Sequence, residues 1–216
     1  MRFAGICQYD GCNYSGFQSQ KNAISVQDKI ELAISSIGHL NGRINYAGRT
    51  DAGVHATHQV FDFSTSDDRA IHQWFKGINS LLPVDIAVSC IKEAPENFHS
   101  RFDAIDRTYS YVIYTGKTRP TFQRNYVYWE KNEIDLNIMK KEASHLVGTH
   151  NFSSFRGSKC TASNPVRTVK SIEIVKKNNF VVIHLCANAY LYNMVRIIVG
   201  TLLDIAKGSN KDIKSI

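Results

Sequence analysis

The sequence predicts an α+β fold made of two tandem, similar α/β units with a largely antiparallel sheet. The expected strands come in runs with helices between them, without the strict strand–helix alternation of parallel sheets. The order of elements in the second half also repeats that of the first. Because no Pro- or Gly-rich linker is present, we divide the chain into residues 1–105 and 106–216 and expect close packing of the two. Two such units can share one sheet with a central cleft.

Three strands and two helices are expected in the first half. The turn pair Asp10-Gly11 closes the first strand, and Pro83 stops the second helix. The first helix shows the i, i+3, i+4, i+7 spacing of apolar residues, beginning at Ile30. In order, the expected elements are a strand Arg2–Tyr9, a helix Val26–Ile37, a strand His58–Phe63, a helix Arg69–Leu82 and a strand Ile86–Ile91.

The second half contains three expected strands and two helices. Alternation along its first strand places Tyr109 and Tyr111 on one face, as in a half-buried strand. Gly148 ends the first helix of this half. The expected elements are a strand Thr108–Tyr114, a helix Leu136–Val147, strands Val169–Val175 and Phe180–Ala187, and a helix Leu191–Lys207.

Charge is distributed unevenly along the chain. The 216 residues carry a formal net charge of +7. Residues 1–105 contain 9 basic and 11 acidic side chains, whereas residues 106–216 contain 17 basic and 8 acidic ones. A positive second half suits a polyanionic partner such as a nucleic acid.

Several classes of protein are excluded by composition. With 43% hydrophobic and 21% charged residues, the chain is globular and neither disordered nor collagen-like. The N-terminus has no secretory h-region, and no apolar run reaches the roughly 18–20 residues that span a bilayer. Five cysteines without a C-x-x-C pair argue against a disulfide framework or a zinc knuckle. We therefore expect a cytoplasmic protein with free thiols and no membrane partner.

One irregular segment, Gly48–Ala56, concentrates chemically useful side chains. Its sequence is Gly-Arg-Thr-Asp-Ala-Gly-Val-His-Ala, and its glycines allow a backbone to approach a ligand closely. Asp51 is a candidate nucleophile or acid–base group, and Arg49 a candidate phosphate or base contact. The alternative is a tight loop in which the aspartate only stabilises a turn.

This nine-residue segment resembles the signature of the TruA family of tRNA pseudouridine synthases. Further segments resemble motifs of the same family in the family's order, over about residues 1–207: Tyr9–Gln18 followed by Ser25-Val26-Gln27, Phe98–Phe102, Arg107–Tyr111, and Tyr190–Arg196 with Gly200. The resemblance implies the pseudouridine synthase fold with an RNA-binding cleft. It also implies isomerisation of uridine to pseudouridine in the anticodon stem-loop of tRNA (positions 38, 39 and/or 40). The implied enzyme is a homodimer without organic cofactor or catalytic metal.

The resemblance also implies roles for individual residues. Asp51 matches the essential aspartate of the family. Three roles remain open for it: attack on the sugar, attack on the base, or removal of a sugar proton. Arg196 matches an arginine that pairs with it; at the edge of an apolar helix stripe, it needs an anion and would keep that carboxylate ionised. Tyr109 matches the tyrosine that stacks on the uracil. Arg49 matches an arginine that helps to extrude the target nucleotide. Two further residues of the matching motifs are expected to bind substrate: His55 and Arg101.

RNA contact is expected mainly from two basic clusters of the second half, which suit phosphates. The first comprises Lys117, Arg119 and Arg124; the second comprises Arg156, Lys159, Arg167, Lys170, Lys176 and Lys177. Singly, each is typical of a solvated surface charge. Phe152 and Phe155 are expected in the core, and His55 with His58 is rejected as a metal pair because further ligands are not clustered nearby.

The sequence also departs from the family pattern. Members continue past the last helix into a closing segment, whereas this sequence stops at Ile216, and Cys12 and Phe17 replace a Thr-like and a Trp-like residue. A catalytically impaired or truncated RNA-binding module of the same fold is therefore the main alternative. A nuclease would need clustered carboxylates, and Asp67-Asp68, the one adjacent pair, is expected to cap a helix.

Overall fold

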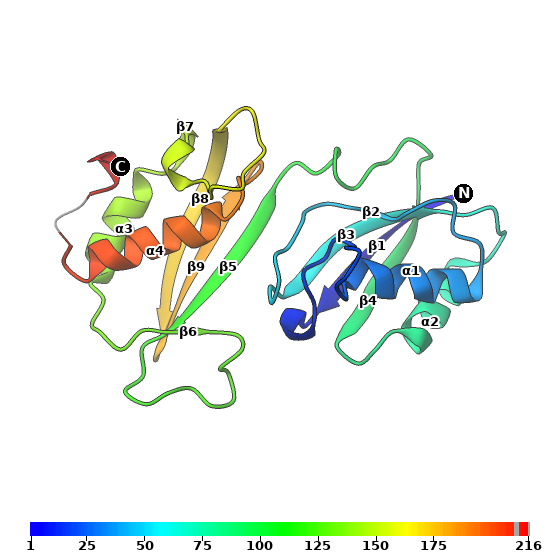
Figure 1. The fold of residues 1–216 in the computed structure, drawn as a ribbon, viewed down its shortest axis with the longest axis horizontal. Helices are drawn as coiled ribbons and strands as arrows, with labels where there is room; N and C mark the ends of the chain where they lie inside the picture. The colour runs from blue at the N-terminus through cyan, green and yellow to red at the C-terminus, as the bar shows by residue number, and fades with distance from the viewer. Residues whose placement is uncertain (210–211, 216) are drawn as a thin grey trace. The chain divides into compact units, whose positions relative to one another are not determined.

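The computed structural model describes residues 1–209 and 212–215 and divides into two compact units, Met1–Ala104 and Ile105–Ile216. Each unit has its own sheet, one of four strands and one of five, with two α-helices beside it (Figure 1). All strand pairs but one are antiparallel. The α+β class is confirmed, with a separate sheet in each unit in place of a shared one.

The first unit has the strand order β2-β3-β1-β4. Its elements are β1 (Arg2–Tyr9), the 3₁₀ turn η1 (Gly11–Asn13), α1 (Val26–Ile37), β2 (Asn45–Tyr46), β3 (Ala56–Ser64), α2 (Ile71–Leu81) and β4 (Ile86–Ala94). Strand β1 pairs with both β3 and β4. Helix α1 begins after Ser25, whose hydroxyl accepts a hydrogen bond from the Asp28 amide at 3.1 Å, a common N-cap.

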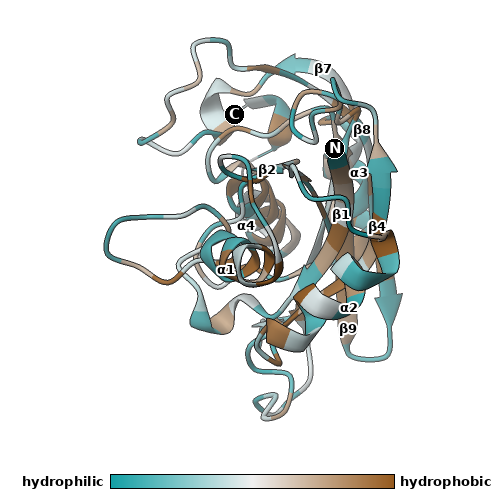
Figure 2. Cartoon of the chain, turned by 90° about the vertical axis from the view of Figure 1, so that its right-hand side faces the viewer, coloured by the Kyte–Doolittle hydropathy of each residue, from teal (hydrophilic) through white to brown (hydrophobic). Residues whose placement is uncertain are grey.

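The core of the first unit lies between its sheet and its two helices. Alternate residues of β1, among them Phe3 and Cys7, are buried, as strand geometry requires. Trp74 of α2 is fully buried, with its ring 6.2 Å from Phe3 and 5.3 Å from Phe63. In Figure 2 brown, hydrophobic stretches run along the helices and strands, and teal stretches mark many connecting loops.

The second unit has the strand order β6-β5-β9-β8-β7. Its elements are β5 (Arg107–Tyr114), β6 (Tyr128–Trp129), α3 (Leu136–Ser144), β7 (Gly148–Asn151), η2 (Ser153–Phe155), β8 (Val166–Lys177), β9 (Phe180–Ala187), α4 (Met194–Ala206) and η3 (Ile213–Ser215). Helix α4 contributes Ile198 and Leu202 to a core that includes Ile183 of β9. Phe152 and Phe155 belong to this core, which confirms their expected burial.

Several element boundaries differ from the expected ones. Helix α2 begins at Ile71 and not at Arg69. Helix α3 ends at Ser144, and residues 148–151 form the additional strand β7. Helix α4 begins only at Met194, because Asn193 before it adopts a left-handed conformation with φ 59°. Asp67 caps no helix; its carboxylate accepts a hydrogen bond from the His39 amide at 2.7 Å. Within the described residues, no helix has the length and apolar character needed to cross a membrane.

A buried carboxylate joins two parts of the second unit. Glu130, 4% exposed, accepts hydrogen bonds from the Asn132 amide at 2.9 Å and from the Lys207 ammonium at 3.3 Å. Burial alone would raise the pKa of Glu130, but these hydrogen bonds and the positive charge of Lys207 outweigh it and hold the pKa below the ordinary value of 4.5. The contact fixes the residues that follow β6 to the end of α4.

We predict that Glu130→Gln lowers the free energy of unfolding at pH 7 by about 1–3 kcal/mol, since it removes the negative charge from a buried acceptor of hydrogen bonds. The pKa of Glu130 is lower in the folded state than its ordinary value of 4.5. Its contribution to the free energy of unfolding is therefore complete well above pH 4.5 and is lost as the pH falls through the folded-state pKa. Urea denaturation between pH 7 and pH 3 measures this. The difference in the free energy of unfolding between wild type and variant should become smaller toward low pH. A difference that does not change with pH would contradict the lowered pKa of Glu130.

Candidate active site

The segment Gly48–Ala56 forms a loop between β2 and β3 in the first unit. At the start of the loop, Gly48 is held by the side chain of Gln59 in β3. This side chain accepts a hydrogen bond from the Gly48 amide at 3.3 Å and donates one to the Gly48 carbonyl. Farther along, the Val54 amide donates to the Asp51 carbonyl at 3.1 Å, closing a tight turn. Asp51 is half-buried, and Arg49 is exposed. The expected loop is therefore present, with Asp51 at its turn.

A second segment, Tyr9–Phe17, supports this loop from the end of β1. The hydroxyls of Tyr9 and Thr50 are 2.9 Å apart, and the Phe17 amide donates to the Thr50 carbonyl at 3.2 Å. The Gly53 amide donates to the Tyr14 carbonyl at 3.3 Å. Thr50, directly before Asp51, and Gly53, two residues after it, are thus both hydrogen-bonded to the Tyr9–Phe17 segment.

Two glycines permit this close approach of backbones. A Cβ at Gly11 would overlap the backbone carbonyl of Val54. Gly16 has φ +96°, a conformation that L-residues rarely adopt, and a Cβ there would overlap the Thr50 carbonyl. Their presence in the Tyr9–Gln18 motif therefore has a steric reason. The spacing of residues in the sequence did not predict this contact, because it joins two segments that are about 40 residues apart.

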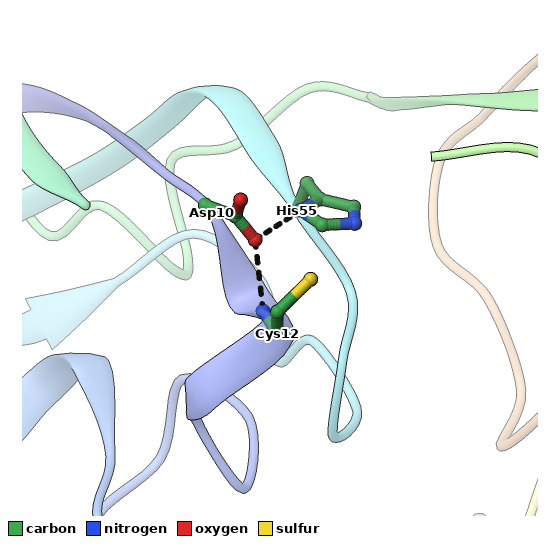
Figure 3. A group of neighbouring side chains, drawn as sticks. All are labelled: Asp10, Cys12 and His55. Atoms are coloured by element: carbon green, nitrogen blue, oxygen red, sulfur yellow. Dashed lines mark hydrogen bonds and ion pairs between the residues drawn. The ribbon is translucent and has the colours of Figure 1, made fainter. Parts of the chain in front are cut away.

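His55 holds the far side of the loop against η1 (Figure 3). Its Nδ1 atom lies 3.1 Å from Asp10 Oδ1 and 3.1 Å from the Gly11 amide nitrogen. A protonated Nδ1 donates to Asp10, whereas an unprotonated Nδ1 accepts from Gly11. Asp10 Oδ1 also accepts from the Cys12 amide at 3.0 Å. The structure thus gives His55, expected to bind substrate, interactions that position the loop.

Asp10, Cys12 and His55 are also the residues that could hold a metal ion. One potential ligand atom from each lies within 4.8 Å of the others, and this is the one such group found in residues 1–209 and 212–215. His58, the other half of the rejected histidine pair, does not belong to it. Hydrogen bonds within the protein account for the positions of Asp10 and His55, so the geometry of the loop needs no ion to explain it.

Arg101 lies in a turn that a buried carboxylate positions. Asp62 of β3 is fully buried; it accepts hydrogen bonds from the Ser100 amide at 2.8 Å and from the Asn45 side chain at 2.9 Å. Arg101 itself is exposed, with its guanidinium 5.4 Å from the centre of the Phe102 ring. The Phe98–Phe102 motif is therefore anchored through its backbone and leaves a cation at the surface.

Tyr109 and Arg196 belong to the second unit. The Tyr109 ring is half-buried and meets the Tyr190 ring edge-on, with centroids 5.1 Å apart; the Tyr190 hydroxyl donates to the Leu185 carbonyl at 2.8 Å. Burial raises the pKa of Tyr111, and the positive charge of Arg196 opposes that rise. Arg196 of α4 is exposed, and its charge acts on Tyr111 of β5, the strand that also carries Tyr109. Tyr111 packs against the core, as expected.

We predict that Gly11→Ala lowers the free energy of unfolding by about 1–3 kcal/mol, because the new methyl group forces apart two packed backbones. Urea denaturation measures the stability, and amide NMR shifts of residues 50–55 report the loop. Cys12→Thr, an exposed change in the same turn, is the control and should stay within about 0.5 kcal/mol of wild type. Wild-type stability and unchanged loop shifts in Gly11→Ala would show that these backbones are not packed in solution.

Comparison with known proteins identifies the family of this chain. A family model described as tRNA pseudouridine synthase matches residues 6–103 and 143–214. A relative from Francisella tularensis subsp. mediasiatica (strain FSC147), named tRNA pseudouridine synthase A, is 40% identical over 201 residues, which cover 93% of this chain and 78% of the relative. One of the same name from Legionella pneumophila (strain Lens) is 40% identical over 210 residues, 97% of this chain and 80% of the relative. The chain therefore belongs to the tRNA pseudouridine synthase family, a family of isomerases.

Proposed function

We propose that this chain converts uridine to pseudouridine in the anticodon stem-loop of tRNA, at positions 38, 39 and/or 40, with Asp51 as the catalytic carboxylate. The observation that carries the proposal is the fixed loop: Asp51 lies between Thr50 and Gly53, both bound to the Tyr9–Phe17 segment. A group held in this way meets a bound nucleotide without further ordering, which favours catalysis. Membership of the family supplies the reaction and the substrate class.

The reaction is an isomerisation, so its atoms balance without a co-reactant. The bond from N1 of uracil to C1′ of ribose breaks, the base turns, and C5 bonds to the same C1′. The proton that leaves C5 is balanced by the proton that N1 gains. Attack by Asp51, or abstraction of a sugar proton by it, needs an ionised carboxylate. In this proposal, Arg196 supplies the positive charge that pairs with Asp51.

Further residues receive roles in the same proposal. Tyr109 stacks on the uracil and assists removal of the C5 proton; its edge-on contact with Tyr190 supports a fixed ring position. Arg49, exposed on the loop beside Asp51, helps to hold the target nucleotide out of the stem. Arg101 contacts the RNA, and His55 acts by positioning the loop that carries Asp51.

We predict that Asp51→Asn lowers the rate of pseudouridine formation by at least about 10³-fold, because it removes the charge and keeps the size. The measurement is tritium release from unmodified tRNA transcripts labelled at uracil C5, with tRNA affinity recorded beside it. Affinity should stay within about threefold of wild type, since Asp51 adds no attraction to phosphates. Asp68→Asn, which lies in the same unit outside the loop, is the matched control and should keep full activity.

The same assay distinguishes the alternatives. Wild-type protein that binds tRNA without forming product would be an RNA-binding module, and the proposed activity would be wrong. An active Asp51→Asn variant would refute the role of Asp51 while leaving the reaction in place. Transcripts with uridine at only one of positions 38, 39 and 40 test which uridine is modified. If pseudouridine formed only at uridines elsewhere in the tRNA, the proposed site of modification would be wrong.

We further propose that the enzyme works as a homodimer in the cytoplasm, as the family resemblance implies. A tRNA is larger than either unit of one chain. In a dimer it can therefore contact both subunits. Size-exclusion chromatography with light scattering should give about twice the chain mass of 24.4 kDa. A monomer in every buffer and at every concentration would exclude the dimer.

A further inference from the structure

The loop between β5 and β6, residues 115–127, combines positive charge with exposed aromatic rings. It runs out beyond the end of its strands (Figure 1). Lys117, Arg119 and Arg124 all lie in it and are exposed. Between Asp106 and Glu130 the sequence contains no acidic residue. This loop therefore presents uncompensated positive charge, which suits a polyanion.

Hydrogen bonds fix both ends of this loop. The Thr115 amide donates to the Asn179 carbonyl at 2.8 Å, at the turn between β8 and β9. The indole N–H of Trp129 donates to the carbonyl of Gly116 at 3.0 Å, which joins the start of the loop to its end. Pro120 is buried in the middle of the loop. The loop is thus a supported structure and not a loose connection.

The outer part of the loop is folded on itself and carries Phe122. Arg124 donates through Nη1 to the Thr121 carbonyl at 3.0 Å, and the Tyr126 amide donates to the Gln123 carbonyl at 2.8 Å. The first of these bonds spans Phe122, which is 90% exposed, and the second follows it. In the same unit, by contrast, Phe152 and Phe155 are buried. Tyr126 of the same loop is also 52% exposed, so the loop carries two exposed aromatic rings among its cations, a combination typical of surfaces that bind single-stranded nucleic acids.

We propose that Phe122 stacks on an unpaired base of the bound RNA, while Lys117, Arg119 and Arg124 contact the neighbouring phosphates. Aromatic rings interleaved with basic residues are the usual means of binding unpaired nucleotides, whose base faces are free to stack. The faces of bases inside a duplex are covered by their neighbours, so a stem alone offers Phe122 nothing to stack on. Three cations in a loop without an acidic residue suit the repeated phosphates of an RNA, which favours RNA over a protein as the occupant.

This inference rests on the proposed function only in taking tRNA as the bound molecule. The loop lies outside residues 6–103 and 143–214, the parts that match the family model. The contact therefore adds to the site around Asp51 and concerns where the RNA is held, not how the base is isomerised. Phe122 is a binding residue in this inference.

The test compares affinities for two RNAs in full-length protein. One is an unmodified tRNA transcript, and the other is a blunt RNA duplex without unpaired bases. Phe122→Ala should weaken binding of the tRNA by about 5- to 100-fold, which corresponds to the loss of one stacked base. Its affinity for the duplex should stay within twofold. Phe122→Trp keeps an aromatic face and should restore the affinity for tRNA.

Two further variants separate stacking from charge and from general damage. Arg124→Gln should weaken both RNAs and reduce the dependence of affinity on salt, because it removes a phosphate contact. Leu32→Ala truncates another exposed apolar side chain, 63% exposed on α1, and should change neither affinity. Thermal denaturation of each variant checks that the fold is retained.

Three outcomes would overturn the inference. The first is an affinity of Phe122→Ala for tRNA within twofold of wild type. The second is an equal loss for both RNAs, and the third is a change of oligomeric state in light scattering, which would show that Phe122 contacts protein. Failure of the proposed function is distinguishable, because it appears as wild-type protein that forms no pseudouridine, whatever Phe122→Ala does to binding.

Discussion

The close contact between the Tyr9–Phe17 segment and the loop that follows Gly48 is the constraint on which the candidate site depends. Most of each segment lies outside the regular helices and strands. The two segments form hydrogen bonds with each other, through Thr50, Gly53 and His55. Buried backbone groups need such partners, and here the partners also determine where Asp51 lies.

This arrangement explains why two glycines occur in the supporting segment. The backbones meet without room for side chains at Gly11 and Gly16, so the loop cannot shift without opening several hydrogen bonds together. A carboxylate on a free loop would lose its orientation through chain entropy. Strand β1, paired on both sides, carries the support directly from the centre of the sheet. The position of Asp51 is thereby tied to an inner strand of the sheet of its unit.

The sequence predicted the regular parts well, and the differences have physical causes. β1, α1 and β9 have the expected bounds because apolar periodicity and turn residues agree there. β2, β6 and β7 were missed, since strands of two to four residues show no period. α4 starts three residues late because the Gly157 amide binds the Tyr192 carbonyl and Asn193 turns left-handed. The sequence indicated Asp51 and Arg49, but not their support, which depends on contacts between distant segments.

The two units differ in the side chains that they would contribute to the proposed reaction. In the first, hydrogen bonds hold the loop that carries Asp51, and Arg49 and Arg101 are exposed cations. The second supplies Tyr109 against a fixed ring, Arg196 on a helix, and most of the positive charge. In the proposed isomerisation these contributions are complementary: the loop of the first unit sets the geometry of the charged group before the base arrives, and the second unit binds phosphates and bases. Because no atoms are gained or lost, binding and positioning are the principal tasks left to the protein.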